Sequence, residues 1–186
     1  MPKRVPPMKS RPARCASSWA NSASVAVRER SMAAWSRSSG FVLYESNTIV
    51  RYLFAKHAAG TLYPDDLTAR FDAERWMDWQ QTTLNRASRD VFWQLIRTKP
   101  EERDHAAMER SRTATDALFA QLDAHLAGRD FIGGARFGMA DIPLGVEAHR
   151  WYGLPIERTP RPNVERWFAA LKGRDAARGI LDMALS

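Results

Sequence analysis

Two long stretches with helical periodicity restrict the larger part of this chain to an all-helical fold. They cover 68–96 and 101–127 and are separated by a break at 98–102 that contains Pro100. Their apolar positions are Phe71, Trp76, Trp79, Leu84, Val91 and Leu95 in the first stretch and Ala107, Ala114, Leu118, Leu122 and Leu126 in the second. Because no alternating apolar pattern follows residue 67, we predict an all-α domain over 67–186.

The best-defined helix start of the chain lies at 137–142. Gly138 occupies the N-cap position, and the carboxylate of Asp141, three residues later, can accept a hydrogen bond from the Gly138 amide as in a capping box. Phe137 and Ile142 flank this box and can form a hydrophobic staple. We therefore treat Asp141 as structural, and we expect Pro143 to kink the helix before it ends near residue 152.

Two further helices complete the predicted domain. One begins at 161–163 and has an apolar face made of Val164, Trp167, Phe168 and Leu171. The other is a short terminal helix over about 176–184.

A strand and a helix precede this domain. The apolar and aromatic run 41–44 predicts a strand, and 47–57 has helical spacing. Ser46 stands between them and suits an N-cap, since its hydroxyl can accept a bond from a first-turn amide. Gly60 and the Tyr63-Pro64 pair then interrupt the periodicity over 58–67, and we place the domain boundary there. The predicted fold class is α+β, with a short mixed part over 41–66 ahead of the helical domain.

The positive charge of the chain lies in its first forty residues. The net charge is +7; residues 1–40 hold eight basic residues against the single acid Glu29, whereas 41–186 hold twenty of each sign. The basic residues are Lys3, Arg4, Lys9, Arg11, Arg14, Arg28, Arg30 and Arg37. An interpretation as a nucleic-acid-binding protein therefore rests on 1–40 alone, and we expect no nucleic-acid partner for the rest.

Three interpretations of 1–40 stay open. Low hydrophobicity with high net charge predicts a disordered, solvated tail. Targeting peptides are likewise rich in Arg and Ser and poor in acids. The third interpretation is translation in a shifted frame, because codons for 32–39, read one base earlier, permit Gly-Gly-Val-Val-Pro-Val-Ile. We favour the shifted frame over the tail, and the tail over the targeting peptide; codons incompatible with that heptapeptide would exclude the shifted frame.

Composition disfavours several classes of protein and site. No apolar run approaches the roughly 20 residues that cross a bilayer, so we expect no membrane partner. The single cysteine, Cys15, excludes an internal disulfide and fits a reducing compartment, from which we expect a cytoplasmic protein. We expect no metal, because metal-ligand spacing is lacking among the four histidines, which are His57, His105, His125 and His149.

Four segments together carry a resemblance to a known family. They are the strand-to-helix segment 41–53, which reads Glu-Ser-Asn-Thr-Ile-Val-Arg-Tyr-Leu from Glu45, the helical segment 73–79, the capping segment 137–142 and the helix start 162–167. In this order and spacing they resemble the cytosolic glutathione S-transferases of the bacterial type over 41–186. The resemblance implies a thioredoxin-like first domain that binds glutathione, with 41–66 as its remnant, and a helical second domain that supplies most of the electrophile pocket.

The resemblance also implies site residues. Glu45 and Ser46 match the pair that binds the γ-glutamyl end of glutathione, the co-substrate. The chemistry agrees, because free amides and a hydroxyl at a helix N-terminus suit a carboxylate, and Glu45 suits the neighbouring ammonium. Plain helix capping is the alternative for this pair. Candidate walls of the electrophile pocket are Trp79, Leu84, Val91 and Trp93, although such residues on a long helix more often belong to the core.

Residues 1–40 do not resemble the front half of the family. The strand and helix that carry the thiol-activating donor, and the cis-proline turn that would precede residue 41, have no counterpart there. We therefore expect a glutathione transferase of small-electrophile detoxification that is impaired in this truncated form. Its catalytic donor is unknown, and its usual homodimer is weakened. The alternative from another class is a non-enzymatic helical protein-binding module.

Overall fold

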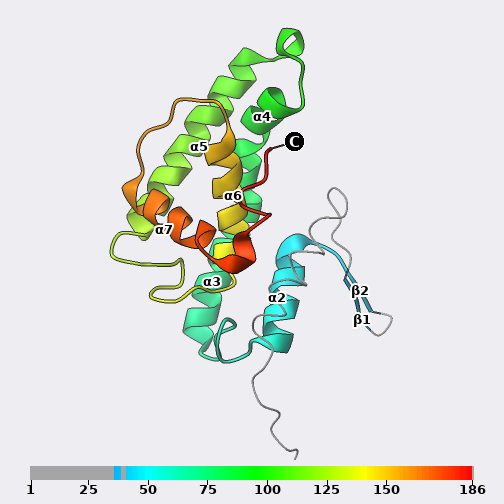
Figure 1. Ribbon diagram of the computed structural model, residues 1–186, viewed down its shortest axis with the longest axis vertical. Helices are drawn as coiled ribbons and strands as arrows, with labels where there is room; N and C mark the ends of the chain where they lie inside the picture. The colour runs from blue at the N-terminus through cyan, green and yellow to red at the C-terminus, as the bar shows by residue number, and fades with distance from the viewer. Residues whose placement is uncertain (1–35, 39–40, 186) are drawn as a thin grey trace, which may run out of the picture.

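The computed structural model describes residues 36–38 and 41–185, which form a two-stranded sheet and a bundle of helices (Figure 1). Helices α3 to α7 make the bundle, α2 lies at its side, and the strands lie beyond α2. The elements are β1 (Ser36–Ser38), β2 (Phe41–Leu43), α2 (Ser46–His57), α3 (Leu67–Trp79), a π-helical turn (Gln80–Leu84), α4 (Asn85–Ile96), a 3₁₀ turn (Pro100–Glu102), α5 (His105–His125), α6 (Asp141–Gly153), α7 (Pro162–Lys172) and a second 3₁₀ turn (Asp175–Ala177).

The strand predicted over 41–44 is present as β2, and its partner strand lies within 1–40, whose composition is typical of a disordered segment. β1 pairs antiparallel with β2, with Arg37 opposite Val42. The other expectations for 1–40 concern residues outside the described part of the chain. A thioredoxin-like origin of 41–66 stays a prediction, because two short strands and α2 do not distinguish it.

The helical run predicted over 68–96 is present, but it is not a uniform α-helix. α3 and α4 join through the π-helical turn, in which an extra residue widens the helix. Asp66 caps α3, where its Oδ2 accepts a hydrogen bond from a first-turn amide at 2.7 Å. The buried residues of α3 are Ala73, Trp76 and Met77. Phe71, which we placed on the same apolar face, is instead 62% exposed.

α5 begins four residues later than predicted and completes a single core. Pro100 opens a 3₁₀ turn instead of the α-helix, and Asp104 caps α5 by accepting from the Ala107 amide at 2.9 Å. One contiguous apolar cluster then fills the space between α3 and α7. Its fully buried members include Met77, Leu84, Val91, Phe119, Leu122, Leu126, Leu144, Val164 and Trp167.

Asp141 joins three segments at the start of α6. Its Oδ2 accepts a hydrogen bond from the Gly138 amide at 2.8 Å, which is the contact that a capping box predicts. Its Oδ1 accepts from the Ile132 amide at 2.9 Å and from the Trp167 indole at 2.8 Å. Burial raises the pKa of the Asp141 carboxyl, and the three hydrogen bonds oppose that rise. The residue therefore ties a preceding loop and α7 to α6, besides capping α6.

Two details of this helix start differ from the sequence prediction. α6 begins at Asp141 with Ala140 as its N-cap, so Pro143 falls in the first turn, where its missing N–H leaves no helical bond unmade. At this position Pro143 gives no reason for the kink that we predicted in the helix. Phe137 packs edge-on against Phe131, with ring centroids 6.1 Å apart, and its staple with Ile142 stays a prediction.

The helix predicted from 161–163 is α7, and its four apolar residues are buried as expected. Asp123 of α5 caps α7, because its Oδ1 accepts from the Asn163 and Val164 amides at 2.8 and 3.0 Å. The terminal helix predicted over 176–184 is wrong: the described residues there form the 3₁₀ turn Asp175–Ala177 and then irregular turns. Gly179 adopts a positive φ of 72°, which does not continue a right-handed helix.

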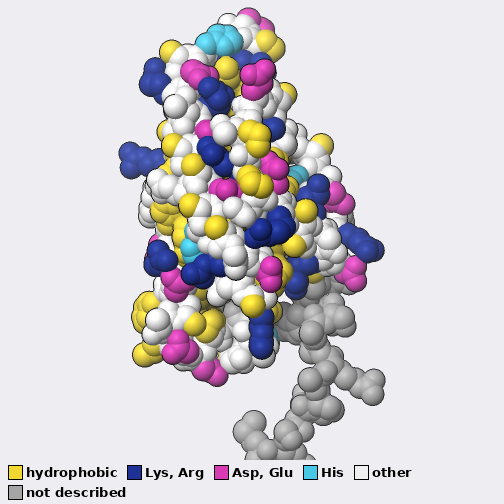
Figure 2. Space-filling view, turned by 90° about the vertical axis from the view of Figure 1, so that its left-hand side faces the viewer, with side chains coloured by type: hydrophobic (Ala, Val, Ile, Leu, Met, Phe, Trp, Pro, Cys, Tyr) yellow, Lys and Arg dark blue, Asp and Glu magenta, His cyan; other side chains and the backbone are white. Residues whose placement is uncertain are grey.

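Charges of both signs are interspersed on the surface. Figure 2 shows Lys and Arg side chains beside Asp and Glu across the face in view, as the equal numbers in 41–186 lead one to expect. In the part of the chain that the structure describes, no helix is long and apolar enough to span a membrane. The same residues contain no group of three or more His, Cys, Asp or Glu placed to hold a metal ion.

Candidate functional site

The corner between β2 and α2 has a strained backbone. Glu45 lies there with φ 71° and ψ 114°, and among the residues that the structure describes it is the one non-glycine residue with a positive φ. Holding a side chain in such a conformation costs of the order of 1–3 kcal/mol, and residues of this kind concentrate at functional sites. The strain marks the corner as a candidate ligand site.

The corner places the first amides of α2 beside two exposed polar side chains. The first backbone hydrogen bond of α2 runs from the Ile49 amide to the Glu45 carbonyl at 2.9 Å, so the amides ahead of Ile49 have no acceptor within the helix. Glu45 is the N-cap and makes no side-chain cap bond; Ser46 is the first helical residue and not the N-cap that we predicted. Both side chains are exposed. A ligand carboxylate can accept from these amides and from the Ser46 hydroxyl, while Glu45 can pair with a neighbouring ammonium.

Asn47 fixes the corner to the helical domain. Its side chain is buried, and its Nδ2 donates to the Met77 carbonyl at 2.8 Å and to Gln80 Oε1 at 3.4 Å. Both acceptors lie where α3 passes into the π-helical turn, so a side chain from the corner bonds the helix at the point where its regular geometry changes. Asn47 Oδ1 is also buried and makes no hydrogen bond with the described residues.

Arg51, one helical turn after Asn47, adds ionic contacts between α2 and α3. Its guanidinium bonds the Asp78 carboxylate and donates to the Glu74 carbonyl at 3.3 Å, and its Nε lies 3.9 Å from Glu74 Oε2. Sequence reasoning missed both Asn47 and Arg51. The available signal was their spacing of four, which places two polar residues on the inward side of a helix that otherwise packs with apolar side chains.

A second polar bridge joins α4 to α6. Glu147 of α6 is 1% exposed, and its Oε1 accepts a hydrogen bond from the Ser88 hydroxyl of α4. Its Oε2 lies 3.5 Å from Arg150 Nη1, as an ion pair without a hydrogen bond. The Arg150 guanidinium lies over the Phe92 ring, 5.6 Å from its centroid. Polar groups thus anchor α3 to α2 before the π-helical turn and α4 to α6 after it.

Comparison with known proteins decides the family. Residues 106–170 match the family described as "Glutathione S-transferase, C-terminal domain". Over 148 residues the chain is 42% identical to glutathione S-transferase GstB of Escherichia coli K12, and the match covers 80% of this chain and 71% of that protein. This chain belongs to the glutathione S-transferase family.

Solved structures of glutathione S-transferases have the same arrangement. The theta class glutathione S-transferase of Xanthomonas axonopodis pv. citri, with glutathione bound, matches with a TM-score of 0.77 at 41% identity, over 81% of this chain and 72% of that one. A glutathione transferase of Burkholderia graminis, with two glutathione molecules bound per subunit, matches with a TM-score of 0.66 at 26% identity, over 75% and 60%. The mostly helical fold is therefore that of the glutathione S-transferases.

The four candidates for this transferase's electrophile pocket do not form one wall. Leu84 and Val91 are completely buried in the core. Trp79 is partly buried and packs edge-on against Trp76, with ring centroids 5.1 Å apart, whereas Trp93 is 52% exposed. Two of the four are thus packing residues, the alternative that we weighed for this stretch.

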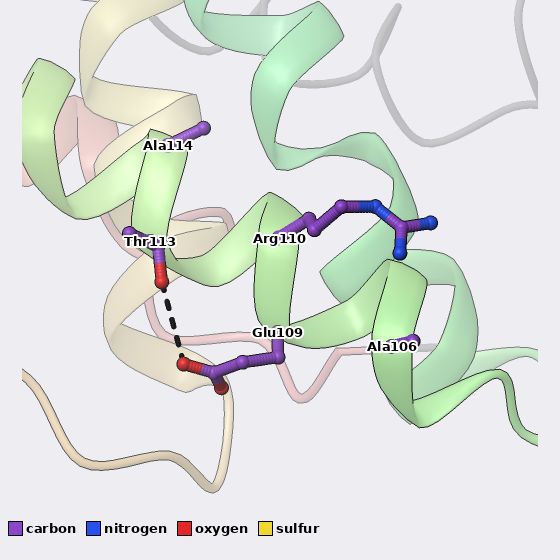
Figure 3. A pocket seen from close by; sticks show the side chains of 5 residues that line it. All are labelled: Ala106, Glu109, Arg110, Thr113 and Ala114. Atoms are coloured by element: carbon purple, nitrogen blue, oxygen red, sulfur yellow. Dashed lines mark hydrogen bonds between the residues drawn. The ribbon is translucent and has the colours of Figure 1, made fainter.

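A shallow hollow on α5 lies apart from the corner of the transferase. Its lining consists of Ala106, Glu109, Arg110, Thr113 and Ala114, which Figure 3 shows along a single helix. The Glu109 carboxylate accepts from Arg112 Nη2 at 2.5 Å and from Thr113 Oγ1 at 3.3 Å, and the Arg112 bond lowers the pKa of Glu109. The hollow shares no residue with the corner or with the α4–α6 bridge, and we assign no part of the glutathione site to it.

Proposed function

We propose that this glutathione S-transferase binds the γ-glutamyl end of glutathione at Glu45 and Ser46 and conjugates the glutathione thiolate, through its sulfur, to small electrophiles. The observation that carries the proposal is the strained Glu45 backbone ahead of a helix whose first amides have no acceptor within the helix. An exposed carboxylate and an exposed hydroxyl stand at the same point and complement the ammonium and carboxylate of an amino-acid end. The similarity to GstB and to a glutathione-bound transferase supports the same ligand.

The reaction requires the thiolate of glutathione. A thiol is a weak nucleophile until it loses its proton, and a hydrogen-bond donor beside the sulfur lowers its pKa. Residues 1–40 do not resemble the part of the family that carries this donor, and we identify no donor among the described residues. We therefore expect the chain as it stands to bind glutathione weakly and to conjugate chlorodinitrobenzene poorly. Ordinary conjugating activity would refute the expected impairment. The homodimer and the cytoplasmic location stay predictions.

Calorimetric titration with glutathione tests the site. We expect a Kd of about 1 mM or below, which is about −4 kcal/mol. Ser46→Ala should weaken binding at least about tenfold, because a hydrogen bond to a charged group contributes about 1.5–3 kcal/mol. Thr68→Ala removes an exposed hydroxyl from the first turn of α3 and is the matched control, which should leave the Kd unchanged. No heat from the parent chain, or equal binding by Ser46→Ala, would overturn the assignment.

A further inference from the structure

Two consecutive carbonyls at the end of α3 accept hydrogen bonds from side chains. The Asp78 carbonyl accepts from Thr82 Oγ1, which lies in the π-helical turn, at 2.8 Å. The Met77 carbonyl accepts from Asn47 Nδ2, which belongs to α2, at 2.8 Å. Side-chain donors that reach the carbonyls of a helix accompany local departures from regular helix geometry. A side chain of α2 therefore contributes to the geometry with which the π-helical turn begins.

The contact between Asn47 and the π-helical turn is buried. Asn47 is 7% exposed, and Gln80, the first residue of the turn, is 6% exposed. Asn47 Nδ2 donates to Gln80 Oε1 at 3.4 Å, besides its bond to the Met77 carbonyl. Separating the two segments would leave buried polar groups without partners, which costs more than an ordinary hydrogen bond contributes. The first turn of α2 and the π-helical turn are therefore expected to move as one unit.

The same turn of α2 carries the proposed ligand group. Ser46 is exposed at the corner, whereas Asn47, the next residue, is buried against α3, which lies beside α2 (Figure 1). Successive residues of a helix point about 100° apart, so one turn presents a hydroxyl outward and an anchor inward. Glu45 keeps its strained backbone only while its surroundings hold it. The Asn47 anchor, two residues away in the sequence, is part of what holds the corner in shape.

Arg51 also joins α2 to α3, but its contacts differ from those of Asn47. It lies one helical turn further from the corner and bonds the Asp78 carboxylate, whose side chain is 66% exposed. Water competes for such an exposed ionic contact, so the contact contributes little. Its other acceptor, the Glu74 carbonyl, lies in the regular part of α3, ahead of the π-helical turn. Arg51 therefore serves as a control for a contact between the two helices that does not reach the turn.

We propose that Asn47 couples the occupancy of the glutathione corner to the order of the π-helical turn. Glutathione at the corner keeps the turn closed, and a chain whose turn is open binds glutathione weakly. The inference rests on the proposed glutathione site and describes how that site is regulated. Coupling between two sites is reciprocal, so each of these effects requires the other. Asn47 acts through Glu45 and Ser46 as a positioning residue.

Amide hydrogen exchange of the full chain, followed by mass spectrometry with and without glutathione, tests the coupling. A ligand that binds only the closed form slows exchange through an opening by 1 + [L]/Kd, which is about elevenfold at about ten times the Kd. We expect the amides of 80–84 to exchange about tenfold more slowly when glutathione is present at that concentration. The amides of α7 (Pro162–Lys172) lie outside the coupled unit and should exchange at an unchanged rate.

Variants locate the coupling, each measured at about ten times its own Kd for glutathione. Asn47→Ala should weaken binding and bring the slowing at 80–84 to about one, because the turn then opens without affecting the corner. Arg51→Gln removes the other polar contact between α2 and α3 and should keep the slowing at about tenfold. Asn47→Ser, whose side chain is too short to reach the Met77 carbonyl, replaces the alanine variant if that variant does not fold or bind.

The parent chain alone can overturn the inference. If glutathione binds and the exchange at 80–84 is unchanged, the coupling is absent and the glutathione site stands. Equal slowing of the α7 amides also overturns it, because glutathione would then act on the whole fold. Tenfold slowing that persists in the Asn47 variant has the same consequence. If the parent chain fails to bind glutathione, the proposed function falls, and this inference with it.

Discussion

Replacing Asp141 by asparagine should destabilise the folded state by about 3 kcal/mol. Asparagine keeps one oxygen for the Ile132 amide and the Trp167 indole, but its Nδ2 then meets the Gly138 amide, donor against donor. The new Nδ2 and the partly buried Gly138 amide are then left unsatisfied, at about 1–3 kcal/mol each. The two remaining bonds also weaken, because the acceptor is no longer charged. Removing a buried charge offsets part of this loss, since burial raises the pKa of Asp141.

Urea denaturation of the purified chain, with far-ultraviolet circular dichroism as the signal, measures this difference. Asp90→Asn makes the same change of charge at an exposed position of α4 and should stay within about 0.5 kcal/mol of the parent chain. Trp167→Phe removes one of the three donors and should lose about half as much as Asp141→Asn. An Asp141→Asn protein as stable as the Asp90→Asn control would refute the argument that this carboxylate joins three segments.

Two further predictions concern packing and pH. Gly145→Ala places a methyl group 2.7 Å from Leu171 Cδ1 and should destabilise the fold, because overpacking costs about 1–3 kcal/mol and the gain in helix propensity is about 1 kcal/mol. Gly133→Ala, whose methyl group meets no atom within 4 Å, is the control. A stabilised Gly145→Ala variant would contradict this prediction. Burial lowers the pKa of His125 and His149, so their neutral forms stabilise the fold above about pH 6.5 and this contribution is lost as the pH falls through the lower folded-state pKa values. The urea midpoint of the parent chain should therefore drop on going from pH 7 toward pH 5 by more than that of the His125→Gln, His149→Gln double variant, and parallel pH profiles would contradict the assignment.

Apolar periodicity and capping residues were sufficient to predict most of the helices. The face made of Val164, Trp167, Phe168 and Leu171 is buried as its spacing indicated, because one side of α7 must cover the core. The bond from Gly138 to Asp141 followed from a spacing of three alone. Both inferences depend on neighbours in sequence, which is why they needed no knowledge of the tertiary structure.

Features that depend on contacts between residues far apart in the sequence could not be predicted from the sequence. No pattern in the sequence indicated that Glu147 would be buried, and its contact with Ser88 is known only from the structure. At the candidate site, Glu45 and Ser46 came from a resemblance, whereas the strain at Glu45 and the anchoring by Asn47 came from the coordinates.

The π-helical turn has a consequence for how this helix can vary among related chains. One residue corresponds to about 100° of rotation in a regular α-helix and to only about 1.5 Å of length. A relative that lacks the extra residue would keep a helix of nearly the same length, but its second half would be turned out of phase with its first. Met77 would still meet Asn47, while the position of Ser88 would point away from Glu147. The turn therefore determines which residues of α4 face α6. A deletion within 80–84 should be tolerated only together with compensating changes on α6.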